Sequence, residues 1–285
     1  ETLAEFLTDR DPKPAAPDLD EVTTHTKRFS ARSSEYFYKV PSIEVRWEST
    51  VKDDRGDFYF ASDNLSDADN LQNIYFYNKV NGALKNLPND VVPKVSIYNS
   101  SGSLLTSSLN SSKISTGTYR CTFSITGSDS DVLSDTWFSG SKSYFTGSIN
   151  ALTRSFADHF TEPEYVLAMP NLKQYYKNYE KPSLRVFVRE KDWSPNFYTV
   201  ATKDLETITL KNLYFKVIRV VDDLTLIDYG ISPIAYTLTS YDKNGNYLDL
   251  DMSMFEKGYS YAIKLMILNG TIKKEFPTAF RFKVE

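Results

Sequence analysis

The chain of 285 residues carries 33 Lys and Arg against 37 Asp and Glu, for a formal charge of −4, and it has no long basic run. This balance argues against duplex DNA or an anionic membrane as a partner, because both attract a basic surface. The single cysteine, Cys121, excludes an intrachain disulfide, and no apolar stretch approaches the roughly 18 residues of a membrane-spanning helix. The length suits two domains, and the abundance of Tyr and Phe favours β-sheet.

Residues 1–34 are predicted to form an N-terminal arm without a core of its own. A proline-rich run, Asp11–Pro17, forces extended backbone in its middle. Such an arm is either a disordered leader or a segment that becomes ordered by docking on a neighbour. The candidate partner-binding residues are the apolar side chains near its two ends, namely Leu3, Phe6, Leu7 and Phe29.

Residues 35–149 are predicted to form a first β domain. Ser42–Trp47 alternates Ile43, Val45 and Trp47 with polar residues, which is the period of a half-buried strand. The Ser- and Asn-rich stretch Ser100–Thr118 is predicted to be a mobile loop. Short strands separated by turn sequences favour a sandwich or a barrel. Further strands are predicted at Asp57–Ala61, Ile74–Val80, Val95–Tyr98, Tyr119–Ile125 and Tyr144–Ile149, with Asn81-Gly82 among the turns.

Residues 150–180 are predicted to form a partly helical connector, followed by a second β domain over residues 181–285. Leu152, Phe156 and Phe160 recur at helical spacing, and Leu172–Tyr179 is a second short helix candidate. Asn244-Gly245 and Asn269-Gly270 indicate tight hairpins, because both positions of such a turn favour positive φ. The strands of the second domain are predicted at Leu184–Arg189, Phe197–Ala201, Leu213–Val221, Tyr236–Tyr241, Tyr259–Leu268 and Ala279–Val284.

The two β domains share short sequence anchors at a nearly constant distance along the chain. We therefore expect a tandem pair of homologous domains in which the two members of each pair occupy the same strand or turn. The pairs are Pro41–Arg46 with Pro182–Phe187, Phe58-Tyr59 with Phe197-Tyr198, Asn73–Phe76 with Asn212–Phe215, Tyr98–Gly102 with Tyr241–Gly245, and Gly117 with Gly258.

Thr116–Cys121 resembles the tyrosine corner of immunoglobulin-like sandwiches, where a Tyr two residues before the strand-F cysteine bonds back to upstream backbone. This gives the corner role to Tyr119, and in Gly258–Tyr261 the second domain's corner tyrosine is displaced by one residue. Since a second cysteine is missing, the resemblance implies a general sandwich rather than an antibody-type domain. The expected fold is all-β: two tandem immunoglobulin-like β-sandwiches, an extended arm and a partly helical connector. Cys121 is expected to be a small buried core residue.

A more specific resemblance covers roughly the last hundred residues. Leu184–Ala201, Asn246–Tyr259 and Phe280–Glu285 are similar to segments of tandem immunoglobulin-like structural proteins of tailed bacteriophages, especially marine ones. The resemblance implies a virion component, made in the cytoplasm of a bacterial host, whose partners are other copies of itself and other virion proteins in a symmetric, multi-copy assembly. It supplies no catalytic motif and no cofactor.

A search for chemistry in the sequence finds no site that outweighs a structural interpretation. His25 and His159 lie far apart in the arm and the connector, which argues against a catalytic triad or a histidine-based zinc site. Asp242–Asn246 spaces oxygen ligands as a calcium loop does, but its glycine is fourth rather than sixth, so a plain β-turn is preferred. Arg55-Gly56-Asp57 matches an integrin-type tripeptide, although Gly56 fits an ordinary turn. Acidic loops at Asp63, Asp67 and Asp69 and at Asp129 and Asp131 are expected to be solvated first and ion sites second.

These observations favour a non-enzymatic structural protein of a tailed-phage capsid, neck or tail that assembles through its arm and its domain surfaces. No catalytic, cofactor-binding or metal residue is predicted. The alternative is an adhesin-like binding module for host-surface glycans or proteins. A third possibility is an accessory domain of an enzyme whose catalytic part lies upstream.

Overall fold

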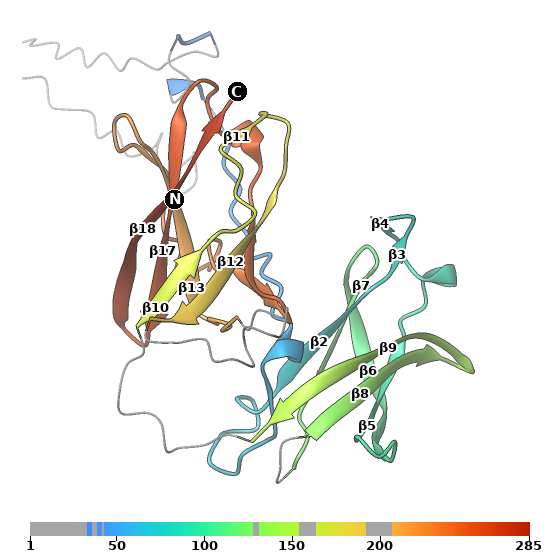
Figure 1. The fold of residues 1–285 in the computed structure, drawn as a ribbon. Coiled ribbons are helices and arrows are strands. Elements are labelled where there is room, and N and C mark those ends of the chain that lie inside the picture. The colour runs from blue at the N-terminus through green and yellow to red at the C-terminus, as the bar shows by residue number, and fades with distance from the viewer. Residues whose placement is uncertain (1–32, 36–38, 42, 128–130, 154–163, 192–206) are drawn as a thin grey trace, which may run out of the picture. The chain divides into compact units, whose positions relative to one another are not determined.

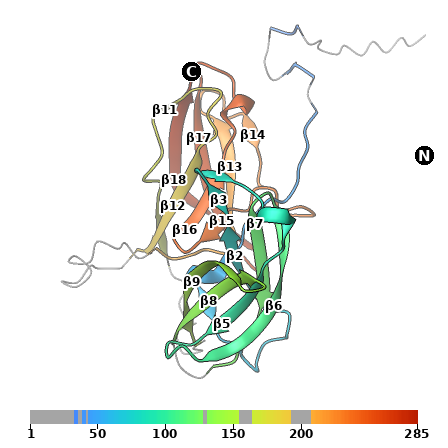
Figure 2. The ribbon, with the colours of Figure 1, turned by 90° about the vertical axis from the view of Figure 1, so that its right-hand side faces the viewer.

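The computed structural model describes residues 33–35, 39–41, 43–127, 131–153, 164–191 and 207–285. The chain divides into two compact units, residues 1–44 and 45–285, and the second unit contains both β domains. The regular structure in the described part of this unit consists of strands and three-residue 3-10 helices (Figure 1; Figure 2 gives the view turned by 90°). An all-β architecture is therefore confirmed.

The second domain is a sandwich of two sheets. One sheet has the order β10 (Tyr165–Ala168), β12 (Ser183–Glu190), β16 (Gly245–Asp249), β15 (Ser240–Asp242). The other has the order β11 (Tyr175–Tyr176), β18 (Ile272–Val284), β17 (Ser260–Asn269), β13 (Leu213–Arg219), β14 (Thr225–Ile227). Strand β11 is parallel to β18, and the other pairs are antiparallel. If the strands are lettered in chain order, the first sheet has the order A-B-E-D and the second the order A′-G-F-C-C′, where β11 is A′ and β14 is C′. These are the two sheets of an immunoglobulin-like domain.

The core of this sandwich comes from strands with the predicted alternation. Leu184, Val186 and Val188 on β12 are almost fully buried, and they join Ile263 and Leu265 of β17 in one apolar cluster. Each alternate residue points to the other face, as the strand period requires. Burial of these side chains contributes roughly 1.5–3 kcal/mol each, so the two facing layers hold this domain without a disulfide.

The first domain has the same strand plan in one continuous, curled sheet. The order is β1 (Phe58–Tyr59), β9 (Lys142–Leu152), β8 (Asp131–Ser139), β5 (Lys94–Tyr98), β6 (Leu104–Ser115), β7 (Thr118–Phe123), β2 (Gln72–Tyr77). The first half of β6 pairs with β5 and its second half with β7, so this long strand belongs to both layers. Ser108 has a φ of 56° inside β6, and register shifts in the β5–β6 pairing mark the same bend. The predicted mobile loop over Ser100–Thr118 is therefore wrong, because most of it is β6.

Both layers of the first domain contribute to its core. Ile74 and Phe76 of β2 and Cys121 of β7 lie in one cluster with Leu133 and Trp137 of β8. The predicted burial of Cys121 is confirmed. A small hairpin of β3 (Lys79–Val80) and β4 (Ala83–Leu84) follows β2, and its turn residues Asn81 and Gly82 both have positive φ, as that sequence predicts.

The two domains share a topology, but the paired sequence anchors do not fall on equivalent strands of it. Asn73–Phe76 lies on β2, the strand-B position, whereas Leu213–Phe215 lies on β13, the strand-C position. Gly102 lies in the turn between β5 and β6, and Gly245 begins β16. The part of Ser42–Trp47 that the structure describes belongs to no strand, although its proposed counterpart forms β12. The anchors are thus shifted by one strand, because aromatic strands and glycine turns look alike wherever they fall in a sandwich.

The helices predicted for the connector are wrong wherever the structure describes them. Asn150–Leu152 completes β9, and Tyr175–Tyr176 forms β11, which pairs with Lys283 and Val284. The backbone of Tyr175–Tyr176 therefore joins the second sandwich rather than a helix. Residues 154–160 of the first predicted helix, and the predicted strand Phe197–Ala201, lie outside the described residues.

The tyrosine corner belongs to Tyr261 rather than to Tyr119. Tyr261 lies on β17, the strand-F position, is fully buried, and its hydroxyl donates to the carbonyl of Glu256 at 2.8 Å. Tyr259, the other tyrosine of Gly258–Tyr261, is 37% exposed. Tyr119 is also fully buried, but it lies on β7, at the strand-E position, and its hydroxyl accepts from the amide of Leu87 at 2.9 Å. It therefore fixes the segment that follows β4 rather than a corner.

We expect Tyr119→Phe to lower the free energy of unfolding of the first domain by about 1–3 kcal/mol. The reason is that the buried amide of Leu87 loses its partner. Denaturant titration followed by tryptophan fluorescence measures the effect. Tyr259→Phe is the matched control, because Tyr259 is part-exposed, and an equal loss in both variants would contradict the role given to the Tyr119 hydroxyl.

Candidate functional site

The segment that precedes the first domain lies against the second domain. We call residues 45–53 the strap. Lys52 forms a parallel bridge with Tyr241 of β15, the Tyr241 amide donates to the carbonyl of Val51 at 2.9 Å, and the Asp53 amide donates to the carbonyl of Tyr241 at 3.1 Å. Farther back, the guanidinium of Arg46 lies over the Tyr236 ring at 4.8 Å. The end of the strap therefore extends the β15 edge of the second sandwich before the chain enters the first.

A single helical turn, η2 (Asp54–Gly56), connects the strap to the first domain. Asp53 caps it, since its carboxylate accepts from the Arg55 amide at 3.2 Å. Gly56 lies against the turn between β15 and β16, where an added Cβ would come within 2.7 Å of the Cα of Lys243. The Asp-Asp-Arg-Gly sequence is thus a capped turn, and its glycine stands where the turn comes closest to the backbone between β15 and β16.

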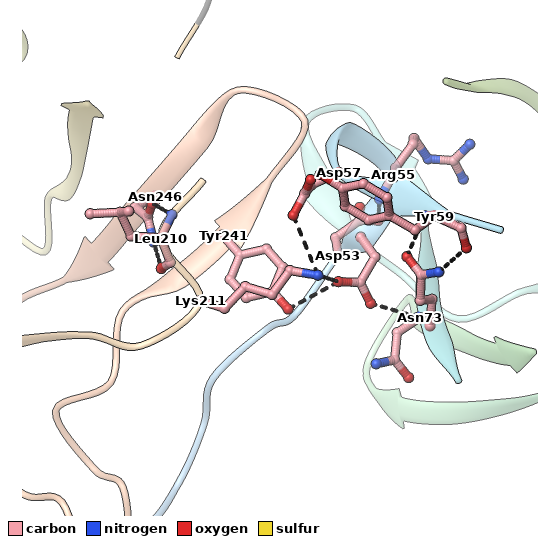
Figure 3. A network of polar contacts seen from close by, with 11 residues as sticks. Asp53, Arg55, Asp57, Tyr59, Asn73, Leu210, Lys211, Tyr241 and Asn246 are labelled. Atoms are coloured by element: carbon pink, nitrogen blue, oxygen red, sulfur yellow. Dashed lines mark hydrogen bonds and ion pairs between the residues drawn. The ribbon is translucent and has the colours of Figure 1, made fainter. Parts of the chain in front are cut away.

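Asp54 is the centre of the contact between the two domains, and Figure 3 labels its partners Asn73, Lys211 and Tyr241. Its carboxylate accepts from the Tyr241 hydroxyl at 3.1 Å and from the Lys211 ammonium at 3.1 Å, both in the second domain. It also accepts from the Asn73 amide of β2 at 2.8 Å, in the first domain. The Lys211 ammonium lies 3.4 Å from Asp57 as well. One buried carboxylate therefore joins the backbone of one sandwich to two side chains of the other.

The same turn closes the edge of the first sandwich. In the described part of this domain no strand lies outside β2. Asp54 occupies the outward-facing amide of Asn73, and the Gln72 side chain accepts from the Tyr59 amide at 2.9 Å. Asp54 thus caps an edge amide at the start of β2, and the Gln72 side chain caps the backbone of β1, the strand at the other end of the sheet order. Both groups would otherwise be open to edge pairing.

Arg55 anchors the turn inside the first domain through a buried, bidentate ion pair with Asp135 of β8. One of its two bonds measures 2.9 Å, Asp135 is fully buried, and the Trp137 indole donates to the same carboxylate at 2.6 Å. Gly147 makes room for the pair, since a Cβ there would lie 2.6 Å from the Arg55 guanidinium. An Arg buried in this way does not present the Arg-Gly-Asp tripeptide to a receptor. That interpretation of the sequence is therefore wrong.

Asp53 is the most perturbed carboxyl in the described structure. Burial raises its pKa to about 7, the nearby Arg55 opposes this, and the charges of Asp242 and Asp54 add to it. Asp53 lines a cleft of about 910 Å³ between the two domains, together with Tyr77, Phe145, Arg185, Asp242 and Tyr247. The cleft combines aromatic rings with charged and hydroxyl groups.

We expect Gly56→Ala to loosen the contact between the domains while leaving each sandwich folded. The added methyl would meet backbone, the Cα of Lys243, which has no freedom to rotate away. Small-angle scattering, or distance measurement between labels placed on each domain, checks the result. Gly82→Ala is the control for a glycine substitution away from the junction: nothing lies within 4 Å of that position, and its φ of 79° strains an alanine only locally, so stability should fall without a change in the distance between the domains. Unchanged distances in Gly56→Ala would contradict the close approach.

The predicted site residues meet different outcomes. Leu3, Phe6, Leu7 and Phe29, and both histidines, lie outside the described residues. The suspected calcium loop is a β-turn: Asp242 pairs bidentately with Arg185 at 2.7 and 2.8 Å and accepts from the Asn244 amide. The Asn246 side chain is fully buried and bonds to both backbone groups of Leu210. Among the residues that the structure describes, no group of three His, Cys, Asp or Glu side chains is placed to hold a metal.

Sequence reasoning did not find the junction residues Asp53, Asp54, Lys211 and Tyr241. The Asp-Asp-Arg-Gly run indicates a turn, and the structure has the turn η2 there. The partners of that turn are separated from it by more than 150 residues, with Lys211 and Asp54 157 apart and Tyr241 and Asp54 187 apart. No local pattern reports a contact of this length.

Comparisons with known proteins add little to this picture. No family model matches the chain, and no curated protein matches it. Among solved structures, the chain is similar to the N-terminal Ig1-2 module of the Drosophila receptor protein tyrosine phosphatase DLAR, at 9% identity over 76% of this chain and 91% of that one, with a TM-score of 0.22. Similar values hold for the tandem Ig repeats of Dlar (10%, 76% and 90%, 0.21) and for Sidekick-1 immunoglobulin domains 1–5 (12%, 71% and 37%, 0.25). The immunoglobulin-like assignment therefore rests on the strand order given above. No helix in the described part of the chain is long and apolar enough to cross a membrane.

Proposed function

We propose that this chain is a non-enzymatic structural subunit of a multi-copy particle, in which its two immunoglobulin-like domains act as one jointed unit. The setting that the sequence favours is the virion of a tailed bacteriophage, on the resemblance carried by residues 184–201, 246–259 and 280–285. Its partners would be further copies of itself and other virion proteins.

One observation supports this function above the others: the chain bonds its first domain to its second through buried groups. Asp54 alone joins the β2 backbone to Lys211 and Tyr241, and the strap adds main-chain bonds to β15. Domains of one chain usually move relative to each other unless their interface is large and hydrophobic, so at this polar junction the buried hydrogen bonds and the ion pair are the contacts that would have to hold the two sandwiches together. A subunit that holds a spacing in a particle needs its domains held relative to each other, and many weak contacts repeated by symmetry then suffice for assembly.

Quantitative mass spectrometry of purified particles tests the proposal. We expect the chain in a fixed ratio to the other structural proteins after repeated density-gradient purification. A yield that falls toward zero as the particles are purified would overturn the virion role.

The same measurement on a variant that lacks residues 1–34 tests the arm. We expect both sandwiches of this variant to fold and the variant to be missing from particles. Full incorporation would contradict a docking role for Leu3, Phe6, Leu7 and Phe29.

The cleft at the domain junction favours a second candidate, a binding module for host-surface glycans. Sugar rings stack on aromatic side chains, and the cleft supplies Tyr77, Phe145 and Tyr247 beside charged groups. The isolated chain should then bind whole cells or a glycan array, and Tyr77→Ala with Tyr247→Ala should abolish that binding. Binding of the isolated chain without incorporation into particles would favour this candidate over the first.

A further inference from the structure

The first half of the strap has the sequence of a sheet strand but no sheet. Val45 and Trp47 alternate with polar residues and are 69% and 63% exposed, although apolar and aromatic side chains at this period normally cover a core. Residues 43–51 belong to no strand of this chain. The sheet edge at β15 is already paired with residues 51–53, so the segment before them has no place left in that sheet.

The polar residues of the strap make its contacts with the rest of the chain. Arg46 lies over the Tyr236 ring, and Glu48 pairs with Lys52 at 3.1 Å. The charge of Glu48 also reaches Tyr214, where burial and this charge together raise the pKa of the phenol. All residues from 43 to 49 are exposed, and Val45 and Trp47 are the apolar and aromatic side chains among residues 45–49, which favours this part of the strap as a surface for another chain.

We propose that residues 45–49 pair antiparallel with the same residues of a second copy of this chain, with Trp47 directly opposite Trp47 of that copy. This inference goes beyond the proposed function and does not depend on it, since purified chain should self-associate whether or not it belongs to a particle. An antiparallel strand pair has a local two-fold axis, so one surface serves both copies.

The charges of the strap select this register. With Trp47 on the two-fold axis, Arg46 of each copy faces Glu48 of the other, which gives two opposite-charge pairs, and Val45 faces Ser49. Moving the axis by one residue, to Arg46 or to Glu48, would place like charges directly opposite each other, which is destabilising in a cross-strand pair. The paired strap is short, so the contact is expected to be weak, as small interfaces are.

Cysteine cross-linking tests the register directly. Val45→Cys and Ser49→Cys chains, mixed and oxidised, should form a mixed disulfide, because directly opposite Cβ atoms lie about 4.5–5.5 Å apart and side-chain motion can bring them to bonding distance. Neither variant alone should cross-link, since two copies of position 45 would lie four residues apart along the strands, about 13 Å. Native Cys121 gives no background: it is fully buried, and burial raises its pKa to about 12. Cross-linking of Val45→Cys alone would overturn this register, and no cross-linking in any mixture would overturn the pairing.

A charge exchange provides the matched control. Arg46→Glu and Glu48→Arg should each weaken self-association about tenfold in sedimentation equilibrium, because each creates like-charge pairs across the axis. The double variant R46E/E48R should restore it. The contact of Arg46 with Tyr236 is lost in both Arg46→Glu and the double variant. Recovery of self-association in the double variant would therefore report the charge pairs between copies and not the contact of the strap with its own chain. Chain that stays monomeric up to ~1 mM, or a double variant no better than the single ones, would refute the proposal.

Discussion

Replacing Arg55 by Met should lower the free energy of unfolding of the first domain by about 3–5 kcal/mol, a large share of a domain's stability. The Arg55 guanidinium is 9% exposed and Asp135 is not exposed at all, so the variant leaves a buried carboxylate with the Trp137 indole as its remaining side-chain donor in the described structure. The loss comes from the stranded charge more than from the bond itself. Urea titration with fluorescence of Trp137 follows the transition.

Two controls separate this effect from a general consequence of removing an arginine. Arg185→Met breaks an equally bidentate pair, with Asp242, but its side chains are 35% and 21% exposed, and we expect a loss of about 1 kcal/mol or less. In the double variant R55M/D135N no charge is left without a partner. Its loss of unfolding free energy should therefore be smaller than the sum of the losses in Arg55→Met and Asp135→Asn. Equal losses in Arg55→Met and Arg185→Met would contradict the buried pair.

Asp53→Asn should make the protein more stable above neutral pH and should flatten its pH dependence below it. Burial raises the pKa of Asp53 to about 7, from 3.8 in the unfolded chain, so the folded state holds the proton more tightly. Such a group contributes stability that is fully present below pH 3.8 and is lost as the pH rises through 7. The difference between the two pKa values corresponds to roughly 4 kcal/mol as an upper limit.

The comparison is made between the wild type and Asp53→Asn at pH 4.5 and pH 8, in the same denaturant series. The two proteins should differ little at the lower pH, because Asp53 is then protonated, and the variant should be the more stable at the higher pH. Asn keeps the oxygen that accepts from the Arg55 amide, so the cap of η2 survives. A variant less stable than the wild type at pH 8 would show that the charge of Asp53 is needed and not merely tolerated.

The sequence predicted features whose cause is local. The alternation of Leu184, Val186 and Val188 gives β12, Asn81-Gly82 reverses the chain with both residues at positive φ, and Cys121 lies in a core. Asn244-Gly245 lies where β15 turns into β16, although only its glycine has positive φ. Each follows from the backbone preference or the polarity of a few neighbouring residues. The fold class followed from many such signals together.

The failures share one physical cause, which is that the deciding contact was distant. Ser42–Trp47 has the same alternation as β12, yet the strap's partner at β15 lies almost 190 residues away and takes only its last residues. Tyr119 has the local sequence of a corner tyrosine, but its strand lies in the other layer. Asp54 looked like an ordinary turn residue, because nothing near it in sequence reveals Lys211 and Tyr241.

The length of the junction contacts has a consequence for synthesis on the ribosome. The backbone groups of Val51 and Asp53 bond to the Ser240 hydroxyl and to the backbone of Tyr241. These bonds cannot form until residue 241 has left the ribosome. The first sandwich is complete in sequence by Leu152, yet Asp54, which covers the outward amide of Asn73 on β2, gains Lys211 and Tyr241 only later. Domains generally fold in the order in which they are made, and long-range contacts form last. Until the second domain has been made, the turn η2, which covers the open edge of the nascent first domain at β2, is held only by its contacts with the first domain. The bonds from Asp54 to Lys211 and Tyr241 form afterwards and fix the turn on its other side.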